Sequence, residues 1–567
     1  MSVFVGKIEK IYNNKKKYRN LNFLIVLVFA LIVFSPFLFK YINGDDTAFH
    51  LANIVYRSDI LFDIPGVIIP NIGNNLGYAT GLFYPSLPHV LGSLIFDIVS
   101  IFGFGGVAAL KFVKLLVILG SAFFMFLFAK SFFDSKEKGM FASLFYITSS
   151  YFFTDLFERD SLNESFVFLF IPLIMLGLHN LFSLKNKKGF YVFFICGYIG
   201  LMYSHLVMAV WFTLLLLFGL LFFIKDIFKK QNFIPLLLSS IIILCFTSTF
   251  TVPMLEHLII GEYGVEIQDN SYGWTALLEC FYKISPIGTG NNWLLLKLPI
   301  LIIVLCLFCV YKLFAGKIAK TRKKFILMIL SLTIISLIIC VVPQFWNFVP
   351  DFLKNLQFQW RLATFVTFGT CILSVEGLDT FFDVFKNNIV KYVKILILIL
   401  LLLFFVSNLK WVNFYDNLSY ELNISGMGWH REYLPEKALK NKEYFDKRDP
   451  SEIVVLKGDA KISIIDNNVP NLTFKVKNST NNTYVELPRI YYIGYKIIDN
   501  NGNTVKYKED KNGFIYMKVN DGVYSLVYEG TVGYKISFIL KSVTIIFLVF
   551  VIIKWFNIFR QTKHNNL

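Results

Sequence analysis

The chain is poor in charged residues. Only 16% of its 567 residues are Asp, Glu, Lys or Arg, against about 25% in soluble domains, while 56% are hydrophobic and the mean hydropathy is +0.60. This balance excludes a soluble globular protein and is typical of a polytopic membrane protein. The formal net charge of +17 comes mostly from Lys and Arg clustered between hydrophobic runs. Such clusters orient a chain in a membrane and contact lipid head groups, so we expect membrane lipid and no nucleic acid as a partner.

Cysteine and histidine are also scarce, with seven of each. Most cysteines lie in apolar runs and the polar segment 409–535 has none, so the sequence predicts no disulfide framework. Cys306 and Cys309 have C-x-x-C spacing, but within an apolar run this spacing is more typical of helix packing than of metal binding.

Long hydrophobic runs are what the chain does have. The first, 22–39, carries no charge and can cross a bilayer. Such runs predict about 11 spans within residues 1–408 and a final span within 536–567. Basic clusters between the runs place both termini in the cytoplasm. If the run 86–104 also crossed, the basic loops that follow it would face outward. We therefore expect this run to lie at the outer interface, inside a first outer loop of residues 40–106.

Residues 409–535 are predicted to form an extracytoplasmic β-rich domain, sandwich-like in form. Short alternating segments between 472 and 528 have the pattern of strands, and Asn-Gly at 501–502, Asn-Gly at 512–513 and Asp-Gly at 521–522 predict hairpin turns. The final span and a cytoplasmic tail follow.

Two acids, Asp45 and Asp46, stand where the first hydrophobic run ends. Carboxylates at a membrane surface are costly to desolvate, so they favour a functional role in cation binding, proton transfer or substrate binding. A solvated helix cap is the alternative. If 46–60 is helical, one helical face carries Asp46, His50, Asn53 and Arg57. That face suits a polar ligand, or else the solvated side of an interfacial helix.

Three further outer segments combine aromatic and charged residues. Residues 73–89 include Tyr84 in a Tyr-Pro-Ser-Leu-Pro run. The loop 155–164 holds Arg159, which could bind a phosphate with paired hydrogen bonds, and Glu164, which could instead cap the next helix. Trp360 and Arg361 stand where an outer loop enters a span. They favour a functional role, and the alternative is that they anchor the chain at the membrane interface.

These segments together resemble the bacterial membrane proteins described as 6-pyruvoyl-tetrahydropterin-synthase-related. The resemblance rests on Gly-Asp-Asp-x-x-Phe-His at 44–50, the Tyr84 run, Arg159 to Glu164, Leu-Gln-Phe-Gln-Trp-Arg at 356–361 and the motif at 428–435. The family usually has Pro, Gly and Pro where this chain has Ser86, Asp160 and Gln359. That family in turn resembles the GT-C membrane glycosyltransferases, which implies a GT-C-like polytopic fold.

The pterin name does not predict the chemistry. Pterin synthase chemistry needs a zinc site with a His-x-His pair, and this sequence has none, so we expect neither pterin nor zinc. A divalent metal is compatible with two carboxylates and a histidine, but the sequence does not decide it.

The GT-C resemblance implies a glycosyltransferase in the cell membrane. It would move sugar from a polyprenyl-phosphate-linked donor to an extracytoplasmic envelope glycan or lipid. Asp45 and Asp46 would be catalytic, and the substrates would contact His50, Asn53, Arg57, Tyr84, Arg159, Glu164, Trp360 and Arg361. The alternative is a lipid-linked saccharide transporter or a non-catalytic assembly partner. A transporter typically shows internal repeats or paired broken helices, and the sequence shows neither.

Overall fold

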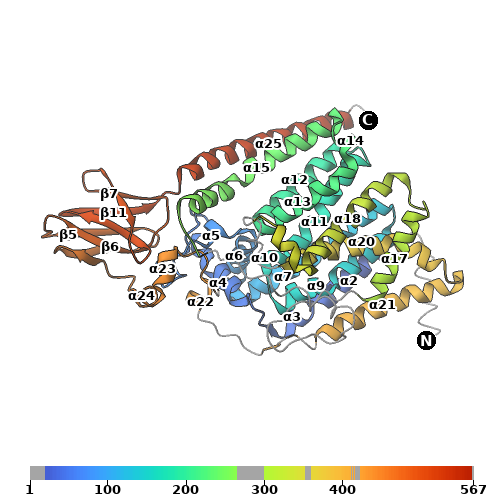
Figure 1. Cartoon of the computed structure of the whole chain (residues 1–567), viewed down its shortest axis with the longest axis horizontal. Helices are drawn as coiled ribbons and strands as arrows, with labels where there is room; N and C mark the ends of the chain where they lie inside the picture. Colours follow the sequence, from blue (N-terminus) through green and yellow to red (C-terminus); the bar gives the residue numbers. More distant parts are fainter. Residues whose placement is uncertain are drawn as a thin grey trace.

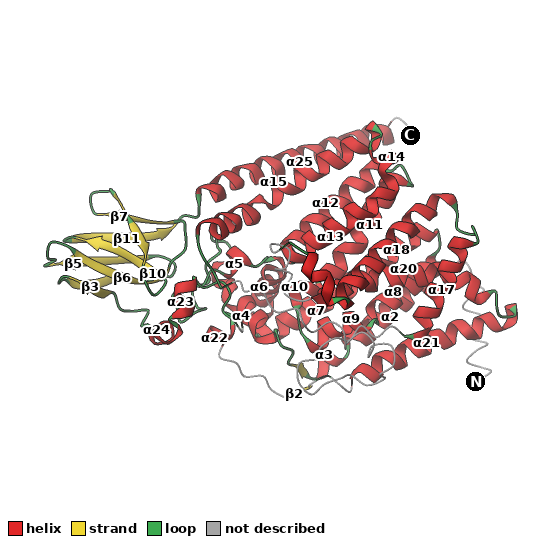
Figure 2. Cartoon of the chain, viewed as in Figure 1, coloured by secondary structure: helices red, strands yellow, loops and turns green. Residues whose placement is uncertain are grey.

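The computed structural model describes residues 20–264, 299–350, 359–409, 412, 414–415, 422–428 and 430–564. A body of helices and a β-rich domain lie end to end along the long axis of the molecule (Figures 1 and 2). The helical elements up to residue 264 are α2 (Leu21–Phe34), α3 (Pro36–Phe39), α4 (Thr47–Arg57), η1 (Ser58–Ile60), α5 (Thr80–Phe83), α6 (Leu87–Ser100), α7 (Gly106–Phe133), α8 (Lys136–Ile147), α9 (Ser150–Phe153), the π-helix η2 (Thr154–Glu158), α10 (Leu162–Ser165), α11 (Val167–Phe182), α12 (Lys187–Ser204), α13 (Leu206–Gly219), η3 (Leu220–Phe223), α14 (Ile224–Ile227) and α15 (Lys230–Ile260).

The second half of the chain contributes fewer helices to this body. They are α17 (Ile300–Phe314), α18 (Lys320–Val341), η4 (Pro343–Phe348), η5 (Gln359–Leu362), α20 (Ala363–Phe382), α21 (Asn387–Leu409) and the C-terminal α25 (Val532–His564). Three short helices, α22 (Leu422–Ser425), α23 (Glu436–Lys440) and α24 (Lys442–Lys447), lie between the body and the strands. Helix α25 returns from the β-rich domain along α15, and the two run side by side (Figure 1).

In the described part of the chain, nine helical segments are long and apolar enough to cross a membrane. They are Leu21–Phe39, Gly106–Phe133, Leu162–Phe182, Leu206–Ile227, Lys230–Ile260, Arg322–Cys340, Trp360–Phe382, Asn387–Leu409 and Val532–Lys554. The chain is thus a polytopic α-helical membrane protein with a C-terminal β-rich domain, as the sequence predicts.

Helix α6 covers most of the run 86–104, which the sequence predicts not to cross the membrane. Its 14 residues rise about 21 Å, less than the roughly 30 Å of a hydrocarbon core. It packs against α4 and α7, and Gly92 allows close approach because a Cβ there would lie 2.6 Å from Ile54. The structure therefore uses α6 as a support for the loop helix α4.

The hydrophobic run 139–157 is not one helix. Helix α8 stops at Ile147, and α9 and the π-helix η2 follow after a break at Thr148 and Ser149. The two hydroxyls bond back to carbonyl oxygens of the last turn, at 2.7 Å to Leu144 and 2.8 Å to Tyr146. Such side-chain bonds compete with helix continuation. The break redirects the chain toward the loop that holds Arg159.

The C-terminal domain is a sandwich of two antiparallel sheets. One sheet has the strand order β3-β6-β10-β9 and the other β4-β5-β11-β7-β8. The strands are β3 (Val454–Lys457), β4 (Lys461–Asp466), β5 (Leu472–Lys477), β6 (Thr483–Ile490), β7 (Tyr495–Asp499), β8 (Thr504–Val505), β9 (Tyr507–Glu509), β10 (Phe514–Val519) and β11 (Gly522–Tyr528). A separate ribbon pairs β1 (Tyr41–Ile42) with β2 (Phe414–Tyr415), so the end of the first span is joined to the chain that follows α21.

Two of the three predicted hairpin turns are hairpins. Asn501–Gly502 joins the paired strands β7 and β8, and Asn512–Gly513 joins β9 and β10. The prediction for Asp521–Gly522 is wrong, because β10 and β11 belong to different sheets. The Asp521 carboxylate instead accepts hydrogen bonds from the backbone of Asn478 and Ser479. These bonds join the β10–β11 connection to the β5–β6 connection, and both connections pass from one sheet to the other.

The sandwich shares one hydrophobic core with the loop that follows α4. Ile69, Leu76 and Tyr78 of this loop are fully buried in the same cluster as Leu487 and Phe514 of the strands. Backbone contacts also join them, since Leu76 O accepts from Ile490 N at 3.2 Å. The predicted segments 40–106 and 409–535 therefore pack as one unit above the helical body.

The helical body has two ends, one beside the sandwich and one opposite to it (Figure 1). We call the end beside the sandwich the sandwich end and the opposite end the basic end. The junctions between α14 and α15 and between α20 and α21 lie at the basic end (Figure 1). Ion pairs join its elements, including Lys138–Asp379 at 2.6 Å and the buried Lys312–Glu376 at 2.6 Å.

Candidate functional site at the sandwich end

The acid pair lies in the turn between β1 and α4. Asp46 is the residue before the first turn of α4, and its backbone N–H donates to the carbonyl of Arg159 at 2.9 Å. Both Asp45 and Asp46 are half-buried, and neither carboxylate accepts a hydrogen bond from any described residue. The pair is therefore held by its backbone, while the carboxylates stay available to a ligand.

Burial and mutual repulsion change the protonation of the pair. Burial, followed by the charge of Asp46, raises the pKa of Asp45 to about 7. Burial also raises the pKa of Asp46, although the guanidinium groups of Arg159 and Arg361 oppose this shift. Burial and the charge of Asp46 therefore favour the protonated form of Asp45 up to about neutral pH.

Arg159, Glu164 and Arg361 form a buried charge cluster beside the acids. Arg159 Nη1 donates to Glu164 Oε2 at 2.8 Å and to Asp155 Oδ1 at 2.7 Å. Arg361 Nε lies 3.3 Å from the same Glu164 oxygen, and the Tyr151 hydroxyl donates to Glu164 Oε1 at 2.7 Å. One carboxylate thus joins two arginines from segments that lie about two hundred residues apart in sequence. Glu164 is not a helix cap but the centre of this cluster.

A second ion pair holds Asp160, which stands where the proteins that the sequence resembles usually have Gly. Asp160 has a φ of +56°, a left-handed conformation that glycine adopts easily and other residues rarely do. Here the aspartate is held by Lys114 Nζ at 2.7 Å and by the Thr47 hydroxyl at 2.5 Å. Lys114 is the ninth residue of the 28-residue α7 and is 2% exposed. Sequence reasoning missed it, although a lysine inside an apolar span was a usable signal.

His50 has two protein partners rather than a ligand. Its Nε2 accepts from the backbone N–H of Leu162 at 3.1 Å, so its Nδ1 carries the proton and donates to His89 Nε2 at 2.9 Å. Burial lowers the pKa of His50 to about 3 and that of His89 well below its usual range. Both rings are therefore neutral, and His50 links α4 to α6 and α10.

Asn53 and Arg57 continue the buried face of α4 away from the acids. Asn53 Nδ2 donates to the carbonyls of Phe49 at 2.9 Å and Gly426 at 3.3 Å, and Arg57 Nη1 donates to Gly66 O at 3.3 Å. Arg57 is eleven residues beyond Asp46, about 16 Å along the helix axis. The predicted polar stripe exists, but it faces the loop after α4 and the C-terminal segment rather than the acid pair.

Aromatic rings gather where the helical body meets the C-terminal segment. Tyr84 is half-buried, with ring centres 5.4 Å from Phe49 and 6.3 Å from His205. Tyr433 of the C-terminal segment stacks on Phe83 at 5.5 Å with a 7° interplanar angle. Flat apolar faces beside carboxylates are typical of sites that bind sugar rings or lipid.

Glu432 is a further acid that sequence reasoning did not select. Burial raises its pKa, and the charge of Asp46 adds to this shift while that of Arg361 opposes it. Its segment is anchored by Tyr433, whose backbone N–H donates to the Tyr78 hydroxyl at 3.1 Å. The family-like motif at 428–435 was the signal that could have marked it.

The remaining predicted residues lie in η5, directly before α20. Trp360 packs against the main hydrophobic core of the helical body, and Arg361 is 8% exposed. Residues 356–358 of the same motif lie outside the described residues. Trp360 thus fixes the turn that carries Arg361 to the helical core.

A metal site is not formed by the side chains that the structure describes, because no group of three or more His, Cys, Asp or Glu residues is placed to hold an ion. His50 uses both ring nitrogens within the protein. The carboxylates of Asp45 and Asp46 could hold a divalent cation only with ligands from a substrate or water.

Comparisons with known proteins identify no family. No protein-family model matches the chain, so the pterin-synthase-related resemblance is not confirmed. An uncharacterized protein of Lactococcus lactis subsp. cremoris (strain MG1363) is 24% identical over 577 residues, covering 89% of this chain and 90% of that protein.

Two solved structures are similar at a low level. ArnT from Cupriavidus metallidurans in the apo state has a TM-score of 0.32 and 12% identity, over 62% of this chain and 76% of that chain. The same protein bound to undecaprenyl phosphate has a TM-score of 0.31 and 11% identity, over 63% and 77%. A likeness at these TM-scores carries no argument about this chain. The polytopic helical fold with its C-terminal β-rich domain stands on the structure itself.

Proposed function

We propose that this protein is a GT-C-type membrane glycosyltransferase that takes sugar from a polyprenyl-phosphate-linked donor. One observation carries the proposal: two half-buried carboxylates with no protein hydrogen-bond donor among the described residues stand beside Arg159 and Arg361 at one end of a membrane-spanning body. The sequence resemblance supports the same class. The acceptor would be an envelope glycan or lipid on the extracytoplasmic side, which we assign to the sandwich end.

The acid pair supplies the general base. A base works best when its pKa lies near the working pH, and the pKa of about 7 for Asp45 meets this condition. In the transfer, an acceptor hydroxyl oxygen bonds to the anomeric carbon of the donor while the bond from that carbon to the phosphate oxygen breaks. The hydroxyl proton goes to Asp45 or Asp46, and the lipid phosphate leaves with the bonding electrons.

We assign different roles to Arg159 and Arg361. Arg159 already donates to Asp155 and Glu164 at 2.7 and 2.8 Å, so its charge is largely used in holding the cluster together. Arg361 lies 3.3 Å from the same Glu164 carboxylate and stands at the first turn of a membrane span. A lipid phosphate at the membrane surface meets a guanidinium at this depth, and Arg361 is therefore the residue that we assign to the leaving phosphate.

His50, Asn53 and Arg57 are assigned as positioning residues. Their partners are His89, Leu162, Gly426 and Gly66, which belong to four different segments. By holding these segments on α4, they fix the turn that carries the acid pair. Tyr84, Tyr433 and Glu432 form the side of the site on which we place the acceptor.

The test is complementation of a deletion strain. Mass spectrometry of the envelope glycans first identifies the sugar that is lost, and the strain then receives wild type, Asp45→Asn, Asp46→Asn or the control Asp63→Asn. Asp63 is an exposed carboxylate of the same loop. We expect loss of transfer by about 10²–10⁴-fold in at least one of the acid-pair variants and full restoration by the control.

A specific result would support the transporter alternative. If both acid-pair variants restored the glycan fully, and the deletion strain held the lipid-linked sugar only in the cytoplasmic leaflet, transport would replace transfer. Accumulation of the unused donor in the outer leaflet supports the transferase.

A further inference from the structure

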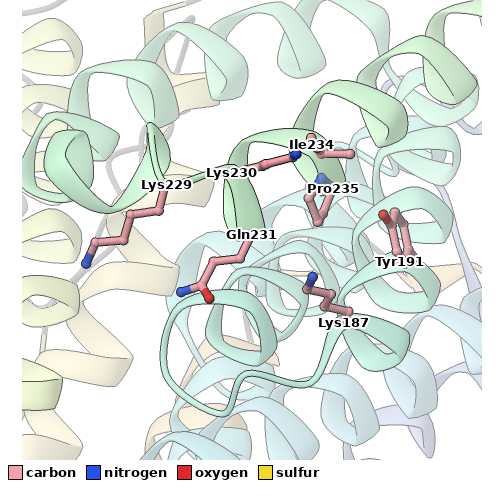
Figure 3. A pocket seen from close by; sticks show the side chains of 7 residues that line it. All are labelled: Lys187, Tyr191, Lys229, Lys230, Gln231, Ile234 and Pro235. Carbon is pink, nitrogen blue, oxygen red and sulfur yellow. The ribbon is translucent and has the colours of Figure 1, made fainter.

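A basic hollow lies at the other end of the helical body, far from the site described above. It is an open hollow of about 750 Å³ between the starts of α12 and α15, lined by Lys187, Tyr191, Lys229, Lys230, Gln231, Ile234 and Pro235 (Figure 3). We propose that this hollow binds the phosphate headgroup of an anionic phospholipid. The proposal does not depend on the proposed function.

Charge makes the hollow an anion site. None of its lining residues is acidic, and three are lysines. Lys229 is paired with Asp226 at 2.7 Å. Lys187 and Lys230 are exposed and have no ion-pair partner among the described residues, so their ammonium groups are the ones available to a ligand.

Two helix starts border the hollow. α12 begins at Lys187 and α15 at Lys230, and the first N–H groups of a helix have no partner within it. The residue that caps α15, Lys229, makes no side-chain cap bond. The Asn186 side chain caps α12 by accepting from the Gly189 N–H at 3.1 Å, so the uncapped start of α15 is the one whose N–H groups favour a phosphate.

The inner wall of the hollow is apolar. Tyr191, Ile234 and Pro235 lie one turn farther along α12 and α15 (Figure 3). Ile234 is 40% exposed, and Leu237 and Leu238 continue the same exposed apolar surface toward the middle of the span. A free phosphate would use only the basic half of the hollow, whereas a phospholipid would use both, with its headgroup on the lysines and its chains on this surface.

The experiment uses the full chain purified in detergent, with bound lipid counted by native mass spectrometry. The probes are dioleoylphosphatidylglycerol, zwitterionic dioleoylphosphatidylcholine and inorganic phosphate. We expect selective retention of phosphatidylglycerol by wild type. The Lys187→Gln/Lys230→Gln variant should bind it roughly 25-fold more weakly, because each lysine near a headgroup contributes roughly fivefold.

The matched control is Lys320→Gln/Lys323→Gln. These two lysines are also exposed at the basic end but do not line the hollow. Replacing them removes the same amount of charge as the Lys187→Gln/Lys230→Gln variant. We expect this control to bind like wild type. Equal loss in both variants would show diffuse attraction and overturn the site, as would equal retention of the two lipids by wild type.

Two further arms complete the test. If inorganic phosphate displaced the lipid at millimolar concentration, the hollow would be a site for soluble phosphate and the lipid assignment would be wrong. If the glutamine variant did not fold, Lys187→Arg/Lys230→Arg would keep the charge, and the lipid selectivity of wild type alone would decide the proposal.

Discussion

At the scale of single residues, Asp45 has the most direct consequence for pH. Its pKa is about 7 in the folded protein against a usual 3.8, so the folded state holds this proton more tightly than the unfolded state. The free energy of unfolding should therefore fall as pH rises from about 4 to about 7 and show no further change from this group above that range. Asp45→Asn should weaken this dependence and be more stable than wild type at pH 8.

The measurement is thermal unfolding in detergent at pH 5 to 8, with Asp63→Asn as the exposed control. The transfer rate should change in the opposite sense, rising with pH through about 7, because the ionised carboxylate is the base. An unfolding profile for Asp45→Asn identical to that of wild type would contradict the raised pKa.

The Lys114–Asp160 pair gives a second residue-scale prediction. Lys114→Met leaves a buried carboxylate without its counter-ion, which typically costs about 3–5 kcal/mol of unfolding free energy. Adding Asp160→Gly to this variant should recover most of the loss, because glycine removes the unpaired charge and suits the φ of +56°. Unfolding free energies of the two single variants and the double variant form the test. Additive losses would show that the two residues are not coupled.

This pair also shows what the sequence could and could not predict about the site. The acids and both arginines could be selected because charge at the end of an apolar run is unusual in itself. Lys114 and His89 could not be assigned partners, because their contacts with Asp160 and His50 depend on how α6, α7 and α4 pack. The protein partners of the polar face of α4 could not be predicted for the same reason, since periodicity gives a face but not what covers it.

At the scale of elements, the turn before α4 depends on one glycine. A Cβ on Gly44 would lie 2.6 Å from the carbonyl oxygen of Glu158 and 2.6 Å from Asp160 Cβ. Gly44→Ala should therefore push the 158–160 turn away from the acid pair and reduce stability by about 1–3 kcal/mol. Transfer should fall with it, because the Asp46 N–H bond to Arg159 O would be disturbed.

The control for this element is Gly105→Ala. A Cβ on Gly105 meets no atom within 4 Å, so this substitution should leave both stability and transfer near wild-type values. Thermal unfolding and the complementation assay measure the two effects. Equal stability and equal transfer in the two alanine variants would show that the close approach at Gly44 affects neither.

Element prediction from sequence worked where local signals act alone. The helix after the acid pair and the Asn-Gly hairpins follow from periodicity and turn chemistry. The break at Thr148 did not follow, because hydropathy does not register two hydroxyls that end a helix within an apolar run. The Asp521–Gly522 turn was misread because a tight turn does not tell which sheet its two strands join.

At the scale of the whole molecule, the charge distribution predicts its sidedness. A cysteine introduced at Asn501, exposed in the sandwich, should react with an impermeant maleimide on intact cells, and one at Lys320 should not. A variant without the native cysteines provides the background, and labelling after membrane permeabilisation confirms that Lys320→Cys is reactive. Labelling of Lys320→Cys in sealed cells would reverse the orientation.

The shared core between the loop after α4 and the sandwich has a consequence for the timing of synthesis. The Ala79 N–H reaches the Tyr492 hydroxyl across 413 residues of chain, and at 5–20 residues per second this interval takes roughly 20–80 s. During that time the loop has left the ribosome but its apolar residues have no partner. A nascent or truncated chain would therefore expose an apolar surface that favours aggregation, and its site would be incomplete. Activity would begin only once the last strand had been translated.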